Sequence, residues 1–278
     1  MGQMVRGATT FRQAINMGSI IAETAAWVAA VVAAGGSVSA GRQTLVNSLI
    51  VGLKADGVWN KLDRAWVLAA ENTQSALIDI KGLATATANG SPTFTVDQGY
   101  TGVQASATVY LDTGFTPSSS GVNFTQNSAH ISGWSNTNVA SLSTGGVMIG
   151  CSDATGGGCG IFPRYSDGKA YYRINDTLAG QSAGVTIGTS QGFYVATRSG
   201  AAASKGYANA VDQSVVAVSS AALASTHQMA ILGYYDNSNH RLGFAGQVSA
   251  ATIGGDLSSA DVTALFNRLG TYRPAVGL

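Results

Sequence analysis

From residue 83 onward, apolar and polar residues alternate in short runs that Gly, Asn, Asp and Ser interrupt. A period of two is typical of β-strands, and many short strands separated by turn residues favour an antiparallel sandwich or jelly roll. Asp167 and Gly168 are expected to form a hairpin turn, because both residue types tolerate positive φ angles. We interpret as strands the runs 94–96, 107–111, 147–149, 171–174, 192–195, 215–218, 229–232 and 242–244.

Before residue 83 the apolar residues follow a helical spacing. Ser39 is a suitable N-cap for a helix in which Leu45, Leu49 and Leu53 recur every four residues, and Gly57 would supply the break. A second helix is expected to bury one face that carries Trp59, Leu62, Trp66 and Ala69. The pattern therefore predicts a helical hairpin packed by tryptophans.

The apolar run 24–34 could be mistaken for a targeting or membrane segment. It is too short to span a bilayer, which takes about 20 apolar residues. The stretch 37–40 resembles a signal-peptidase site, but Glu23 abuts the apolar run and the leader before it would be unusually long. We therefore predict a short packed helix and no membrane insertion.

The chain is expected to close with one helix. Ser258 would cap it, and Asp261 would complete a variant of the capping box. Gly270 is expected to end the helix. Its buried face would carry Val262, Leu265, Phe266 and Leu269.

The chain thus divides into three parts. Residues 1–22 lack a core pattern and are interpreted as an N-terminal arm. Residues 23–82 form the helical module, and residues 83–278 form a jelly-roll domain that ends with the C-terminal helix. The predicted fold class is mainly β.

Charge is scarce and unevenly placed. Charged residues make up 10% of the 278 residues, and the net charge is +1, whereas about a quarter of the residues in a typical globular protein are charged. Between Gly82 and Pro163 there is no Lys or Arg, which excludes a nucleic-acid surface there because phosphate binding needs clustered cations. So few charges favour a protein that forms a homo-oligomer or is built into a larger particle.

Catalytic chemistry is poorly provided for. No Glu follows Glu71, and most aspartates of the β region lie in turn contexts, so the sequence offers no preferred pair of carboxylates for glycoside hydrolysis. His130, His227 and His240 are the only histidines, and no Gly-x-Ser-x-Gly motif is present. We expect no enzymatic activity.

The two cysteines, Cys151 and Cys159, flank a glycine run. With no histidine nearby they do not favour a zinc site. A small loop disulfide and a reduced pair both remain open. We expect no cofactor.

Near the C-terminus a strand over 242–251 is followed by the segment 253–258, a short helix with Leu265 and Phe266, and Tyr272 two residues after Gly270. This order resembles the end of concanavalin A-like (laminin-G-like) jelly rolls. The resemblance implies a β-sandwich whose relatives include glycoside hydrolases with paired glutamates, which this β region lacks. Some relatives also hold calcium, but no EF-like ligand spacing supports it here.

Upstream, the segment from Trp27 through 35–39 and 52–59 to residues 62–64 is similar to the helical module that precedes such a domain in tailed-phage virion proteins. This resemblance implies a virion protein. Residues 1–22 lie outside it, and we expect them to attach the protein to the particle.

Glycan binding needs an aromatic face and polar groups that bond to sugar hydroxyls. One hairpin loop has that mixture in Tyr234, Tyr235, Asp236, Asn237, Ser238, Asn239, His240 and Arg241. Trp134, with Asn136 and Asn138 nearby, is a second candidate, and the tyrosines at 165, 171 and 172 are a third. The alternative interpretation is core packing for one tyrosine of each pair and turn formation by the asparagines.

The sequence therefore predicts a phage fibre, spike or decoration protein of the virion that binds host surface polysaccharide by avidity. A homotrimer is expected, because three chains could bury the tryptophans of the helical module together. The first alternative is a purely structural protein that binds only other virion proteins. The second is a polysaccharide depolymerase, which would need two aspartates converging on a groove.

Overall fold

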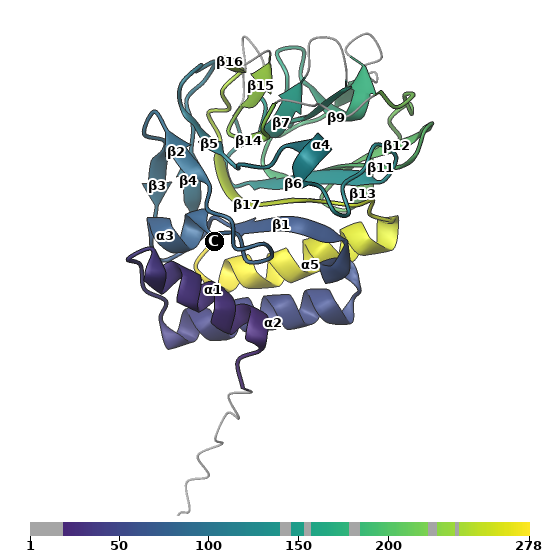
Figure 1. Cartoon of the computed structure of the whole chain (residues 1–278). Helices are drawn as coiled ribbons and strands as arrows, with labels where there is room; N and C mark the ends of the chain where they lie inside the picture. The colour runs from purple at the N-terminus through teal and green to yellow at the C-terminus, as the bar shows by residue number, and fades with distance from the viewer. Residues whose placement is uncertain (1–18, 140–145, 153–156, 178–183, 222–226, 237–238) are drawn as a thin grey trace, which may run out of the picture.

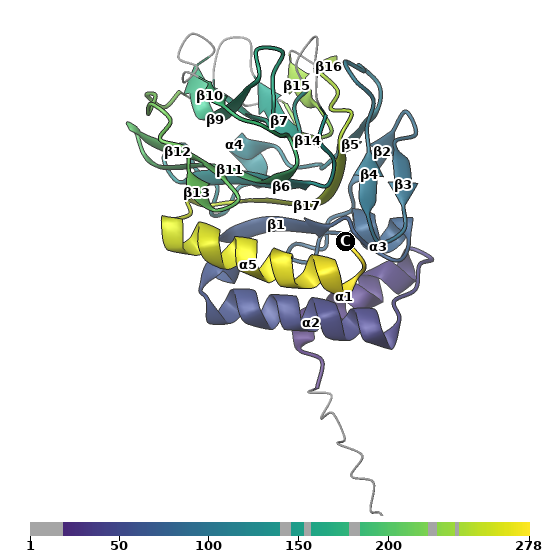
Figure 2. The same ribbon diagram turned by 180° about the vertical axis from the view of Figure 1, so that it is seen from behind.

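The computed structural model describes residues 19–139, 146–152, 157–177, 184–221, 227–236 and 239–278. Two β-sheets pack face to face as a sandwich, and a layer of helices covers the outer face of one of them (Figures 1 and 2). The mainly β, jelly-roll-like sandwich with a C-terminal helix is thus confirmed.

The first sheet lies next to the helices. Within the described residues it has eight strands in the order β13-β12-β11-β6-β17-β4-β3, with β1 also paired to β17. All of these pairs are antiparallel. The strands are β1 (Leu62–Val67), β3 (Thr93–Thr95), β4 (Gly99–Thr101), β6 (Ala129–Ser135), β11 (Gly192–Gly200), β12 (Ala203–Ala208), β13 (Val211–Asp212) and β17 (Gln247–Gly254).

The second sheet lies on the side of the sandwich away from the helices. Its described strands follow the order β10-β9-β8-β7-β14-β5-β2, and β15 pairs with both β16 and β7. The contact of β15 with β7 is parallel, whereas the other pairs are antiparallel. The strands are β2 (Thr87–Asn89), β5 (Tyr110–Asp112), β7 (Ile149–Ser152), β8 (Gly157–Phe162), β9 (Lys169–Thr177), β10 (Val185–Thr186), β14 (Ala230–Ile231), β15 (Tyr234–Asp236) and β16 (Asn239–Arg241).

Two of the helices begin at the serine caps that the sequence predicts. Ser39 accepts a hydrogen bond from the backbone N–H of Arg42, and Ser258 and Asp261 form the expected capping box. Among the described residues no helix is long and apolar enough to cross a membrane. The helices are α1 (Ala22–Ala33), α2 (Ala40–Ala55), the 3-10 helix η1 (Val58–Lys61), α3 (Thr73–Leu77), α4 (Pro117–Ser120) and α5 (Ser259–Ala275).

Two apolar cores flank the first sheet. One lies between the two sheets and contains Ile131 and Tyr194; the other lies between the first sheet and the helices and contains Trp134, Val195 and Leu265. Strands β6 and β11 contribute to both cores, because successive side chains of a strand point to opposite faces. The helical layer therefore packs on the sandwich through a continuous core.

The second helix expected over residues 59–69 is wrong, because this segment forms η1 and then strand β1. Ala65 and Val67 enter the core under the helices, whereas Trp66 and Leu68 enter the core between the sheets. The spacing of the apolar residues fits a helix, but pairing with β17 buries both faces of the segment as a strand. By this pairing the part before residue 83 contributes a strand to the sandwich.

The tryptophans before residue 83 are buried within one chain, with Trp27 and Trp66 each 1% exposed and Trp59 4% exposed. They are therefore not available to pack three chains together, which removes the physical reason given for a trimer. The oligomeric state itself stays a prediction.

Of the predicted strand runs, 215–218 and 242–244 form no strand. Leu242 has a φ of 51°, which ends the extended backbone after β16, and Val216 is 67% exposed. The other six runs overlap observed strands, and the turn at Gly168 has the expected positive φ of 77°. Helix α5 does not end at Gly270 but continues to Ala275.

Candidate functional site

The tyrosine hairpin of β15 and β16 lies at the end of the sandwich remote from the helices (Figure 1). The hydroxyls of Tyr235 and Tyr110 are hydrogen-bonded at 2.6 Å. The ring of His240 stacks on Tyr110, with the centroids 3.9 Å apart. His240 is buried, and this burial lowers the pKa of its imidazole to about 4, so the ring is neutral at pH 7. Tyr235 and His240 thus pack the hairpin onto β5.

The other residues of the hairpin differ in exposure. Tyr234 and Asp236 are half-buried, Asn239 is exposed, and Asp236 lies 3.6 Å from Arg241 as an ion pair. Asn237, also proposed as a ligand contact, lies outside the described residues. The hairpin therefore offers a ligand two half-buried tyrosines, one of which is already hydrogen-bonded to Tyr110, and a polar pair, whereas His240 is buried.

Trp134 lies elsewhere, near the end of β6 on the face that α5 covers. Phe266, Gly270 and Arg273 of α5 are spaced by four and three residues, which places them on one side of the helix. The rings of Phe266 and Trp134 stack with centroids 5.2 Å apart, and Cζ of Arg273 lies 4.1 Å from the centroid of the indole. Trp134 is only 7% exposed, so most of the indole belongs to the core. The structure does not bring it together with the tyrosine hairpin.

A groove of about 470 Å³ opens beside this stack. We call it the aromatic groove; it is lined by Trp134, Phe266, Asn267, Gly270, Thr271 and Arg273. Aromatic edges, an amide, a hydroxyl and a guanidinium meet there without a carboxylate. This is a combination that suits a polar ligand with apolar ring faces.

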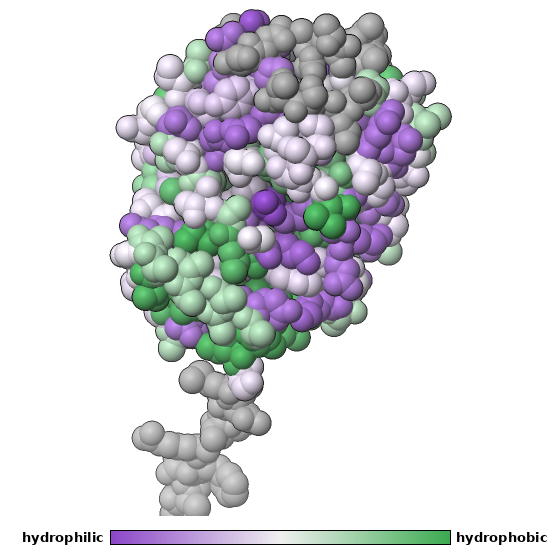
Figure 3. Space-filling model, viewed as in Figure 1, coloured by the Kyte–Doolittle hydropathy of each residue, from purple (hydrophilic) through white to green (hydrophobic). Residues whose placement is uncertain are grey.

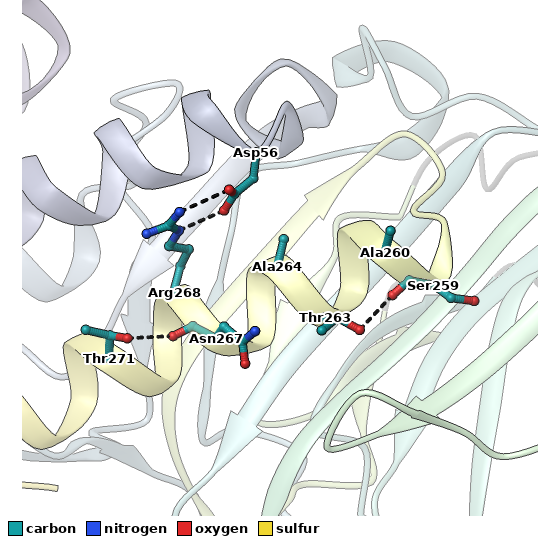
Figure 4. A pocket seen from close by; sticks show the side chains of 8 residues that line it. All are labelled: Asp56, Ser259, Ala260, Thr263, Ala264, Asn267, Arg268 and Thr271. Carbon is teal, nitrogen blue, oxygen red and sulfur yellow. Dashed lines mark hydrogen bonds and ion pairs between the residues drawn. The ribbon is translucent and has the colours of Figure 1, made fainter.

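A larger groove of about 690 Å³ runs along α5 toward the end of α2, and Asn267 and Thr271 line both grooves (Figure 4). Arg268 donates to both carboxylate oxygens of Asp56, at 2.7 and 3.0 Å, and thereby neutralises the charge at its edge. The hydroxyl of Thr263 donates to the carbonyl oxygen of Ser259. Its two charged side chains bond to each other, its two threonine hydroxyls donate to backbone carbonyl oxygens of α5, and no aromatic residue lines it, so it offers a ligand less than the aromatic groove does.

Carboxylates are sparse in the grooves near α5. A third groove, of about 270 Å³, contains Asp256, and the larger groove contains Asp56, so that none of the three is lined by two carboxylates. No three His, Cys, Asp or Glu side chains of the described part gather as metal ligands. None of these three grooves therefore offers the paired carboxylates of glycoside hydrolysis.

Sequence reasoning missed Arg273 as a site residue. The helical spacing of Phe266, Gly270 and Arg273 could have indicated it. Because the helix was expected to end at Gly270, Arg273 was not placed on the same helix face. That Trp134 lies under this face follows only from the packing of α5 on β6. The sequence therefore allows the residues on this side of α5 to be predicted, but not that Trp134 packs against them.

No protein-family model and no curated protein sequence matches the chain. Among solved structures, the chain is similar to the Trypanosoma rangeli sialidase in complex with 2,3-difluoro-KDN. The TM-score is 0.51 and the identity 8%, over 84% of this chain and 40% of that chain. It is also similar to botulinum neurotoxin type C, whose uptake by cells depends on interaction with two ganglioside molecules. There the TM-score is 0.51 and the identity 15%, over 76% of this chain and 52% of that chain.

A third similar structure is domain 4 of AbnA, a GH43 extracellular arabinanase from Geobacillus stearothermophilus, in complex with arabinotriose. The TM-score is 0.47 and the identity 15%, over 74% of this chain and 98% of that domain. The chain spans 40% of the sialidase and 52% of the neurotoxin chain. At 8% and 15% identity, the similarity to the sialidase and the neurotoxin shows a shared β-sandwich fold alone.

Proposed function

We propose that this protein is a non-catalytic, glycan-binding virion protein of a tailed phage. The observation that carries the glycan part is the aromatic groove, where the stacked rings of Trp134 and Phe266 adjoin polar groups of Asn267, Thr271 and Arg273. Sugars are held by an accessible aromatic ring together with hydrogen-bonding side chains, and here the partly buried Phe266 supplies the aromatic surface. Botulinum neurotoxin type C, which has a similar fold and interacts with gangliosides, supports a glycan as the ligand.

Binding without catalysis is proposed because the grooves beside α5 lack a pair of carboxylates. Adhesion through many copies would then supply the affinity that one shallow groove lacks. This is the expected behaviour of a fibre, spike or decoration protein.

Residues 1–22, of which 1–18 lie outside the described residues, are proposed to attach the protein to the particle, and the helical module 23–82 is proposed to bind other copies of the chain. The outer side of α1 is apolar, and Figure 3 shows a hydrophobic area over this part of the molecule. Val32 is 57% exposed, and Ile20 and Val51 are 40% and 43% exposed. Exposed apolar side chains grouped in this way favour a contact with another protein surface. The same observation favours the alternative function, a decoration protein that binds only virion components.

The test is adsorption of the labelled protein to host cells, with and without periodate oxidation of the surface glycans. The double variant Asn267→Ala/Thr271→Val removes polar groups of the aromatic groove from exposed positions of α5. Thr263→Val is its matched control, because Thr263 and Thr271 both donate to the carbonyl oxygen four residues earlier. Tyr234→Ala tests the tyrosine hairpin separately.

Periodate-sensitive adsorption that falls in the double variant and not in the control would support the aromatic groove as the glycan site. A fall only in Tyr234→Ala would move the site to the hairpin. A folded protein that does not adsorb, or adsorbs equally after periodate, would refute glycan binding and favour the structural alternative.

A further inference from the structure

Arg273 is held in a fixed position by neutral groups. Its Nε donates to the hydroxyl of Ser249 at 3.1 Å, and its Nη2 donates to Oδ1 of Asn136 at 2.9 Å. The guanidinium lies over the indole of Trp134. Among the described residues no hydrogen bond uses its Nη1. A guanidinium held on one edge and one face keeps its other donors for a ligand.

Within the part of the chain that the structure describes, no acidic group neutralises the charge of Arg273. No carboxylate of the described residues lies within ion-pair distance of it, although Arg268, on the same helix, is paired with Asp56 at 2.7 Å. Burial lowers the pKa of Arg273 to about 10, so that the group remains a cation at neutral pH. A half-buried cation without a counter-ion is costly, and an anion that enters the groove would offset that cost.

The surroundings of Arg273 narrow the class of anion. The partly buried ring of Phe266 offers apolar surface to the C–H face of a sugar ring, whereas the amide of Asn267 and the hydroxyl of Thr271 suit its hydroxyls. Arginine receives a carboxylate through two parallel N–H donors, which fixes its orientation. A ligand that has a ring with a C–H face, hydroxyl groups and a carboxylate is an acidic sugar.

We propose that the aromatic groove binds an acidic sugar residue of a polysaccharide, a uronate or a sialate, and that Arg273 receives its carboxylate. This inference rests on the proposed glycan-binding function and specifies the substrate class of the same site. The uronate and the sialate share the carboxylate on a sugar ring, and the ligands of the test separate them.

The test measures binding of the full chain to polygalacturonate, polysialic acid and methyl-esterified polygalacturonate by isothermal titration calorimetry. The ester keeps the sugar backbone and removes the negative charge. At least one acidic polymer is expected to bind ten times more tightly than the ester. Arg273→Gln should weaken that binding at least tenfold, and Arg273→Lys, which keeps the charge without the two parallel donors, should lie between.

Arg268→Gln is the matched control, since it removes an arginine of the same helix whose charge Asp56 already neutralises. It is expected to change the affinity less than twofold. The thermal midpoint of each variant shows whether it is folded, and Arg273→Lys keeps the test informative if Arg273→Gln does not fold. Polyglutamate tests for an acidic protein partner, and binding as tight as to the sugar polymers would overturn the proposal.

The failures of the two proposals can be distinguished. Periodate-sensitive adsorption to cells that Arg273→Gln leaves unchanged would refute the acidic sugar and leave glycan binding intact. Equal affinity for the acidic polymers and the methyl ester would likewise refute the acidic sugar and leave glycan binding intact. If the folded parent neither adsorbs to cells nor binds any of the polymers, both proposals are refuted.

Discussion

The guanidinium of Arg42, in α2, donates a hydrogen bond of 2.7 Å from Nη1 to the hydroxyl of Tyr272, near the end of α5. Both groups also donate to the carbonyl oxygen of Ala69, at 2.8 and 3.0 Å. Nη2 of Arg42 forms an ion pair with Asp97. This single buried side chain thus ties together α2, α5, the end of the β1 segment and the β3–β4 turn.

The contact predicts two graded losses of stability. Tyr272→Phe removes two hydrogen bonds, the one accepted from Arg42 and the one donated to Ala69, so the free energy of unfolding should fall by about 1–2 kcal/mol. Arg42→Ala removes a buried stem, the ion pair with Asp97 and the bonds to Tyr272 and Ala69, so a loss of roughly 2–3 kcal/mol is expected. Urea unfolding followed by tryptophan fluorescence measures both. Arg268→Ala, which breaks an exposed ion pair, should cost less than about 1 kcal/mol, and an equal loss in it and Arg42→Ala would contradict the assignment.

Gly270 lies inside α5 and has room for a methyl group. A Cβ added there would meet Trp134 Cη2 at 3.6 Å, an ordinary contact, and the residue does not have a positive φ. Gly270→Ala should therefore raise the free energy of unfolding by about 0.5–1 kcal/mol through helix propensity. In Gly52→Ala of α2 the new Cβ would meet Arg268 Nε at 2.6 Å, so this variant should gain less. A lower melting temperature for Gly270→Ala would show that α5 does not continue through this position.

His130 should make stability depend on pH. Its Nδ1 lies 2.5 Å from the carbonyl oxygen of Gly255 and its Nε2 lies 3.0 Å from the hydroxyl of Thr252, so the neutral ring is satisfied. Burial lowers its pKa to about 4, against about 6.5 in an unfolded chain. The unfolded state thus binds the proton first, and the stabilisation present above pH 6.5 is lost as the pH falls toward 4.

The measurement is the free energy of unfolding of the parent and of His130→Asn at pH 7 and pH 4.5. The advantage of the parent should shrink by about 2–3 kcal/mol between these values. The parent alone would not isolate His130, because burial also raises the pKa of Asp176 to about 6. The stability that Asp176 contributes is present below its unfolded pKa and is lost as the pH rises through 6, which is opposite to the effect of His130. The difference between parent and variant removes this contribution, since both proteins contain Asp176. An advantage that is the same at both pH values would refute the role of His130.

Cys151 and Cys159 are register partners across β7 and β8, and both are buried free thiols. A hydrogen bond to Cys159 and burial raise the pKa of the Cys151 thiol, which disfavours the reactive thiolate. We expect Ellman's reagent to react slowly with the native protein at pH 8 and to detect two thiols after unfolding in urea without reductant. The variant Cys159→Ala should then show one. A count of zero in the unfolded parent would indicate a disulfide.

The apolar side of α1 predicts self-association or binding to a particle component. Val32→Glu places a charge on this surface at an exposed position, so it should not disturb the core. We expect the variant to have a smaller mass than the parent in sedimentation velocity, or to lose incorporation into particles. Thr44→Glu, at an exposed position of α2, controls for added charge alone. An unchanged mass and unchanged incorporation would assign the apolar side no role.

Local chemistry made much of the fold predictable. Ser39 and Ser258 begin helices because their side chains bond to backbone N–H groups within three residues, and Gly168 forms its turn through its own φ angle. The alternation after residue 83 predicts the sandwich because one face of each strand must be buried. Each of these signals is carried by residues that are neighbours in the chain.

The sequence by itself thus determined the mainly β class, the helix starts and the tight turn, whereas the tertiary structure decided what each apolar segment contacts. The segment 62–67 has a spacing that suits a helix, yet it is a strand because β17 supplies hydrogen-bond partners and cores lie on both of its sides. Trp134 and Arg273, 139 positions apart in the numbering, meet only because α5 packs across β6. Burial, pairing and the charge left without a counter-ion depend on residues distant in the chain, and no local pattern encodes those distances.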